Sequence, residues 1–156
     1  MIKVLFVCLG NICRSPACEA ICRKFYQEMG NNYSNKIKVS SAAMTYFHLN
    51  ESADSRIQKV CAKNGIDISH HRSKQMRKID WYTYDYIVAL DDEIFRILQE
   101  TKPPICKSRI LLFNAPYGIC DPYYGGRIAF SQMFNEIKIN MEPFLRENNL
   151  VNLQIN

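Results

Sequence analysis

Short apolar runs alternate with longer amphipathic stretches along most of this chain. Four runs rich in β-branched and aromatic residues have the pattern of strands buried on both faces. Four further stretches repeat apolar residues at every third or fourth position, which is typical of helices. The predicted strands span residues 2–8, 36–43, 85–91 and 108–114. The predicted helices span residues 15–29, 54–64, 92–100 and 126–147.

This strand–helix alternation predicts an α/β fold with right-handed crossovers. We expect one domain over residues 1–156, a three-layer sandwich around a four-stranded parallel sheet of order 2-1-3-4 with helices on both faces. Residues 66–84 are expected to be an irregular, basic segment. In such sheets ligands bind outside the carboxyl ends of the strands. The turn after the first strand, CLGNICRS at residues 8–15, is therefore the expected ligand-binding loop.

The composition indicates a cellular compartment and limits the classes of binding partner. The 156 residues are 47% hydrophobic and 22% charged, with a net charge of +5 that is weaker than dedicated nucleic-acid binders usually carry. The chain has seven cysteines, an odd number that cannot all form disulfides within the chain. No apolar run reaches the roughly 18 residues of a membrane span. We expect a reduced, cytoplasmic, monomeric protein without membrane or nucleic-acid partners.

The loop at residues 8–15 fails the tests for several kinds of site. A zinc site needs about four ligands, and no second Cys or His pair has ligand spacing. The lysine and glycines of a nucleotide P-loop are missing, and so is the dinucleotide GxGxxG pattern. We therefore expect no metal and no cofactor.

A reactive thiol in an anion-binding loop fits the same residues. Backbone N–H groups of a tight loop converge on an anion, and the following helix adds its positive end. Ser15 and Pro16 are the expected N-cap and first residue of that helix. Arg14 offers a planar fork to two oxygens of a tetrahedral anion. Cys8 beside this cationic loop is expected to ionise and attack phosphorus, with Ser15 donating to the sulfur.

Displacement of an alkoxide or phenoxide also needs a proton donor. Asp121 lies in the loop after the fourth strand, at the same sheet edge as Cys8. On chemistry alone, Asp85, Asp91 and Asp92 remain equal alternatives for the general acid.

Several segments together resemble the low-molecular-weight protein tyrosine phosphatases. They are VCLGNICRSPACEA, VSSAA, ISH, DYIVALD and CDPYYG, and the resemblance runs from about residue 2 to 147. It implies a metal-independent phosphatase that hydrolyses phosphotyrosine in proteins through a cysteinyl-phosphate. It also implies that inorganic phosphate and other tetrahedral oxyanions compete with the substrate.

The resemblance assigns roles to individual residues. Cys8 is the implied nucleophile, Arg14 holds the phosphate, and Asp121 is the general acid and then the base. Asn11 is expected to hold the loop in shape, supported by Ser41 and His70. Cys13 is expected to pair reversibly with Cys8 under peroxide. The residues expected to contact substrate are Leu9, Gly10, Asn11, Ile12, Cys13, Ser15, Phe47, Tyr123 and Tyr124.

Two related activities remain alternatives at this point. Arsenate reductases share the loop but recruit further cysteines, and protein-arginine phosphatases carry a threonine where this loop has Ile12. The bulkier Ile12 favours a flat phenyl ring and hence tyrosine. Phe47 stands where the family usually has Trp or Tyr. A phosphate-binding module without turnover, and nucleic-acid binding through the basic residues 69–78, are the readings from other classes.

Overall fold

The computed structural model describes residues 1–151, and these form a single α/β unit around one parallel sheet. The predicted strand order β2-β1-β3-β4 is confirmed, and all three pairings are parallel. The last two strands are shorter at both ends than the predicted ranges 85–91 and 108–114. The strands are β1 (Ile2–Cys8), β2 (Ile37–Ala43), β3 (Tyr86–Ala89) and β4 (Arg109–Leu112).

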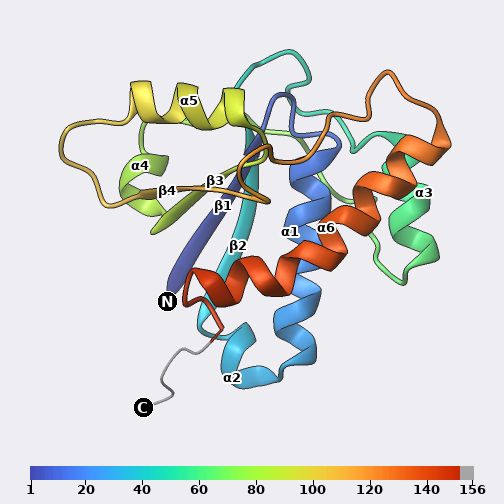
Figure 1. The fold of residues 1–156 in the computed structure, drawn as a ribbon, viewed down its shortest axis with the longest axis horizontal. Coiled ribbons are helices and arrows are strands. Elements are labelled where there is room, and N and C mark those ends of the chain that lie inside the picture. Colours follow the sequence, from blue (N-terminus) through green and yellow to red (C-terminus); the bar gives the residue numbers. More distant parts are fainter. Residues whose placement is uncertain (152–156) are drawn as a thin grey trace.

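Helices cover both faces of the sheet (Figure 1). Four of them match the predicted helices: α1 (Arg14–Glu28), α3 (Ser55–Lys63), α5 (Asp92–Thr101) and α6 (Arg127–Glu147). Sequence reasoning missed α2 (Asn31–Ser34) and α4 (Asp80–Thr83). Each has four residues, which is too short for a helical period to show.

Two apolar clusters hold the layers together, one on each side of the sheet. Alternate residues of β1 point to opposite faces, so Phe6 enters one cluster and Val7 the other. The larger cluster lies under α1, α3 and α6, where Phe6 packs edge-on against Phe113 with ring centroids 6.4 Å apart. The smaller cluster lies under α4 and α5 and includes Trp81 and Leu98.

The strand register brings three connecting loops to one edge. Cys8 pairs with Ala43 of β2, and Val7 pairs with Ala89 of β3. Ala89 in turn pairs with Leu112 of β4, so the carboxyl ends of all four strands lie together. The loop after β4 folds back over this edge at Gly118, which has a positive φ of 79°. A side chain there would collide with the backbone of residues 90 and 91.

The start of α1 differs from the prediction. The helix begins at Arg14 with Cys13 as its N-cap residue, so the expected N-cap at Ser15 is wrong. Ser15 lies in the first turn and its hydroxyl contacts the sulfur of Cys8. The described part of the chain, residues 1–151, contains no helix long and apolar enough to cross a membrane.

Candidate active site

Cys8 ends β1 and is almost completely buried at the floor of the carboxyl-end edge. Its sulfur accepts a hydrogen bond from the backbone N–H of Asn11 at 3.3 Å. The Oγ of Ser15 lies 3.0 Å from the same sulfur. That hydroxyl already accepts a bond from Asn11 Nδ2 at 2.7 Å, which leaves its own proton free for Cys8. Both contacts direct a hydrogen-bond donor at the sulfur.

Asn11 fixes the shape of the loop. Its φ of 57° lies in the left-handed region, which asparagine tolerates better than most residues. Nδ2 donates to Ser15 Oγ and, at 2.9 Å, to Ser41 Oγ on β2. Oδ1 accepts from the backbone N–H of Lys74 at 3.1 Å. The whole side chain is buried, and its polar atoms have hydrogen-bond partners, so it holds the loop from behind. Asn11 was predicted to contact the substrate, but it does not line the cavity.

His71, and not His70, supports Asn11. The Nε2–H of His71 donates to the carbonyl oxygen of Asn11 at 2.8 Å. Burial lowers the pKa of His71, so its neutral form is favoured. His70 is exposed, and among residues 1–151 the hydrogen bond from a histidine to Asn11 comes from His71 alone. The prediction for His70 is therefore wrong, because adjacent residues in this turn point in different directions.

Arg14 carries a positive charge into the floor of the site, with its side chain only 4% exposed. Nη1 donates to Asp91 Oδ2 at 2.7 Å and to the carbonyl oxygen of Ile119 at 3.1 Å. Nη2 lies 3.6 Å from Asp121 Oδ2. Burial alone would lower the pKa of Arg14, but the negative charges of Cys8, Asp91 and Asp121 outweigh it and raise the pKa.

The structure separates Asp121 from the three aspartates that chemistry alone left as alternatives. Asp85 lies at the amino end of β3, where it binds the backbone of Lys3 and the side chain of Lys107. Asp91 is occupied twice, as the N-cap of α5 and as the partner of Arg14. Asp92 begins α5 and does not line the cavity. Asp121 lines the cavity with Cys8 and is 42% exposed, so it can reach a substrate.

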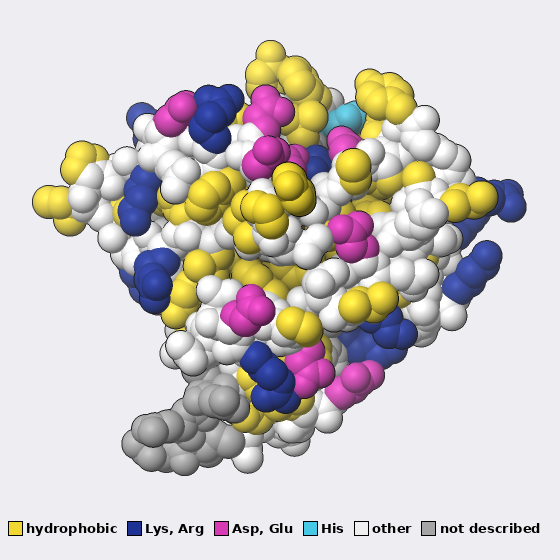
Figure 2. Space-filling view, viewed as in Figure 1, with side chains coloured by type: hydrophobic (Ala, Val, Ile, Leu, Met, Phe, Trp, Pro, Cys, Tyr) yellow, Lys and Arg dark blue, Asp and Glu magenta, His cyan; other side chains and the backbone are white. Residues whose placement is uncertain are grey.

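These residues surround a cavity of about 220 Å³ at the carboxyl-end edge. Phe47 and Tyr124 project from its rim, with 66% and 98% of their surfaces exposed. Figure 2 shows hydrophobic side chains protruding along this upper edge beside acidic groups and a histidine. Sequence reasoning missed Thr45 and His48, because nothing in their loop marks them. The predicted residues that line the cavity are Cys8, Leu9, Gly10, Ile12, Cys13, Arg14, Phe47, Asp121, Tyr123 and Tyr124.

The remaining cysteines are chemically distinct from Cys8. Burial raises the pKa of Cys13 and the charge of Asp54 raises it further, so this thiol stays protonated in the reduced protein. Burial likewise raises the pKa of Cys18 and of Cys22 on α1. All seven cysteines are free thiols. Reversible pairing of Cys8 with Cys13 therefore stays a prediction.

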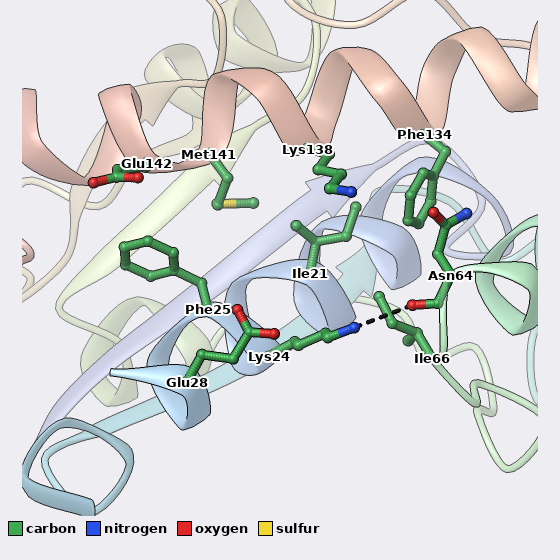
Figure 3. A pocket seen from close by; sticks show the side chains of 10 residues that line it. All are labelled: Ile21, Lys24, Phe25, Glu28, Asn64, Ile66, Phe134, Lys138, Met141 and Glu142. Atoms are coloured by element: carbon green, nitrogen blue, oxygen red, sulfur yellow. Dashed lines mark hydrogen bonds between the residues drawn. The ribbon is translucent and has the colours of Figure 1, made fainter. Parts of the chain in front are cut away.

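A second hollow of about 330 Å³ lies between α1 and α6 (Figure 3). Its walls are apolar and its rim carries lysines and glutamates. Lys24 donates to the carbonyl oxygen of Asn64 at 3.1 Å, and Glu142 pairs with Arg146. No cysteine, histidine or aspartate lines this hollow, so it lacks the thiol and the aspartate that the first cavity holds. Among residues 1–151 no group of three or more His, Cys, Asp or Glu is placed to hold a metal ion.

Comparison with known proteins agrees with this geometry. A family model described as low molecular weight phosphotyrosine protein phosphatase matches residues 3–153. The chain is 36% identical to a human protein of that description, over 93% of this chain and 94% of the relative. It is 35% identical to the chicken protein, again over 93% of this chain and 94% of the relative.

Solved structures give the same result. A protein tyrosine phosphatase from Entamoeba histolytica, with Hepes in its active site, superposes with a TM-score of 0.84 at 32% identity. The match covers 96% of this chain and all of that one. A Drosophila arginine phosphatase also reaches a TM-score of 0.84, at 27% identity and over 94% of this chain and 98% of that one. The chain thus belongs to the low-molecular-weight phosphotyrosine protein phosphatase family.

Proposed function

We propose that this protein hydrolyses phosphotyrosine in proteins, without a metal, through a cysteinyl-phosphate on Cys8. One observation carries the proposal: a single cavity holds the sulfur of Cys8, the guanidinium of Arg14 and the carboxyl of Asp121. A nucleophile, a fixed cation and an exposed acid are what displacement at a phosphate monoester requires. Inorganic phosphate and other tetrahedral oxyanions are expected to compete for the same place.

In the first step the sulfur of Cys8 attacks phosphorus, and an S–P bond forms as the P–O bond to tyrosine breaks. Asp121 gives its proton to the departing phenolate oxygen, so tyrosine leaves as a neutral phenol. Arg14 stays in place and neutralises charge on the transferring oxygens. Its bond to Asp91 orients the fork before substrate arrives.

In the second step Asp121, now a carboxylate, takes a proton from water. The water oxygen attacks phosphorus, and the S–P bond breaks to return Cys8 as a thiolate and release phosphate. Ser15 supports this departure because its proton is directed at the sulfur. The step restores both Cys8 and the protonated Asp121, so the cycle closes without a cofactor.

The walls of the cavity favour an aromatic leaving group. Ile12 lies in the loop wall, and Phe47 and Tyr123 belong to the facing segments. A phenyl ring can pack between such apolar surfaces, whereas the short side chain of phosphoserine cannot fill them. The similarity to an arginine phosphatase makes phosphoarginine the competing substrate.

The role of Cys8 is tested by Cys8→Ser, assayed with p-nitrophenyl phosphate in the presence and absence of EDTA. Because the variant lacks the thiolate that attacks phosphorus, kcat is expected to fall on the order of 10⁴-fold or more. EDTA is expected to leave the activity of the parent protein unchanged. Phosphate binding without turnover in the parent would favour a binding module, and EDTA-sensitive activity retained in the variant would sink the mechanism.

The role of Asp121 is tested by Asp121→Asn with two aryl phosphates. Phenyl phosphate has a poor leaving group that needs the proton, so its kcat/KM is expected to fall by roughly 10²–10⁴-fold. p-Nitrophenyl phosphate leaves more easily, and its kcat/KM is expected to fall much less. Equal losses for the two substrates would show that another group is the acid.

The leaving-group preference is tested by a side-by-side assay of phosphotyrosine, phosphoserine and phosphoarginine peptides of one sequence. We expect the largest kcat/KM for phosphotyrosine, because its ring packs against Ile12 and Phe47. Arsenate reduction, measured in parallel with a thiol donor, is expected to be absent. Faster turnover of phosphoarginine than of phosphotyrosine by the parent protein would contradict the proposed preference. If Ile12→Thr then shifted the preference toward phosphotyrosine, the role of Ile12 would be the opposite of the one proposed.

A further inference from the structure

Asp121 lies on an exposed turn, yet general-acid catalysis needs it at a fixed place over Cys8. The segment 120–126 makes few bonds of its own. The N–H of Gly125 donates to the carbonyl oxygen of Pro122 at 2.8 Å, and the N–H of Tyr123 donates to Asp121 Oδ1 at 3.1 Å. Both bonds are local, so they shape the turn without locating it relative to the nucleophile.

Arg56 on α3 supplies an attachment from outside the turn, in addition to the 3.6 Å contact between Asp121 Oδ2 and Arg14 Nη2. Its Nη1 donates to the carbonyl oxygen of Gly125 at 3.2 Å. Its guanidinium carbon also lies 5.6 Å from the ring centroid of Tyr123 and 4.3 Å from that of Phe130, at distances where a cation attracts an aromatic face. Within residues 1–151, this is the one hydrogen bond from a side chain elsewhere to the turn at 121–126.

The other side of the Arg56 fork is held by Asp54. Nε donates to Asp54 Oδ1 at 3.0 Å and Nη2 donates to Oδ2 at 2.8 Å, a two-pronged arrangement that fixes the plane of the guanidinium. The hydrogen bonds from Arg56 hold the pKa of Asp54 below its ordinary value, so the carboxylate stays charged. Asp54 also caps α3 through the N–H of Arg56.

Asp54 is in turn bonded to the loop that carries the nucleophile. Its backbone N–H donates to the carbonyl oxygen of Ile12 at 2.9 Å. A continuous path therefore runs from the Cys8 loop through Ile12, Asp54 and Arg56 to Gly125. At the far end, a side chain at Gly125 would collide with Ala129, so the turn comes close to α6.

We propose that Arg56 is a positioning residue that sets the distance between the general acid Asp121 and the phosphorylated Cys8. It touches neither substrate nor reacting atoms, and it acts by holding the Pro122–Gly125 turn against α3. This inference rests on the proposed function of Asp121. An arginine suits the task better than a lysine, because one planar fork serves Asp54 and Gly125 at once.

The experiment compares Arg56→Met with the parent protein on phenyl phosphate and p-nitrophenyl phosphate. Methionine keeps much of the apolar contact with Phe130 but loses the charge and every donor. If Asp121 loses its place, kcat/KM for phenyl phosphate is expected to fall on the order of tenfold more than for p-nitrophenyl phosphate. Arg56→Lys, which keeps the charge and loses the fork, is expected to fall between Arg56→Met and the parent.

A double variant separates positioning from general damage. In an Asp121→Asn background the acid is already gone, so Arg56→Met is expected to change the ratio of the two kcat/KM values by less than about twofold. Arg146→Met is the matched control, because Arg146 pairs with Glu142 on α6 and does not line the cavity. The control is expected to leave both kcat/KM values unchanged.

Two results would overturn the proposal. One is an equal change for the two substrates in Arg56→Met, which leaves the ratio of their kcat/KM values as in the parent protein, and the other is full additivity with Asp121→Asn. If Arg56→Met does not fold, as judged by thermal unfolding, Arg56→Lys decides through the same ratio. If Cys8→Ser loses all activity while Arg56→Met keeps the parent's ratio of the two kcat/KM values, the role of Arg56 is rejected and the proposed function stands.

Discussion

A buried positive charge organises this molecule. The side chain of Arg14 is 4% exposed, and three groups from two parts of the chain converge on its guanidinium. Asp91 reaches it from the end of β3, the carbonyl of Ile119 from the loop after β4, and Asp121 from the same loop. A buried charge without partners costs several kcal/mol, so these contacts also hold the loops together. The arrangement of these two loops around the anion-binding site thus depends on one residue.

The loop around Cys8 shows how the chain maintains an uncommon backbone conformation. Asn11 has a positive φ, and its side chain and carbonyl bond to Ser15, Ser41, Lys74 and His71. Those partners come from α1, from β2 and from the segment that follows α3, so the tertiary structure maintains the local geometry. The consequence is chemical: the N–H of Asn11 and the hydroxyl of Ser15 both point at the sulfur.

The strands and the loop were predictable because their signals are local. The apolar run before Cys8 predicted β1, and the alternation of periods predicted a parallel sheet with its loops at one edge. Because the loops that carry Cys8, Arg14 and Asp121 follow strands that end at this edge, their proximity was predictable from the sequence alone.

Features that depend on the direction of one side chain were not predictable. His70 and His71 are identical in type and adjacent, and only the turn geometry selects His71. Ser15 is a residue type that often caps helices, but α1 begins one residue before it, at Arg14, with Cys13 as the N-cap. Arg56 and Gly125 are 69 residues apart, so no periodicity relates them. Asp91 is an alternative general acid on sequence grounds, but in the structure it accepts a hydrogen bond from Arg14 and orients that guanidinium.

The central claim is that phosphorus is transferred to the sulfur of Cys8. The most direct measurement is rapid denaturation of the enzyme in alkaline detergent during turnover of p-nitrophenyl phosphate, followed by mass spectrometry of its peptides. The account predicts one phosphoryl group, located on Cys8, stable in base and lost in mildly acidic solution, where the S–P bond of a phosphorothioate monoanion hydrolyses. A phosphoryl group on another residue, or steady turnover with no phosphorylated enzyme under conditions that preserve a thiophosphate standard, would contradict it.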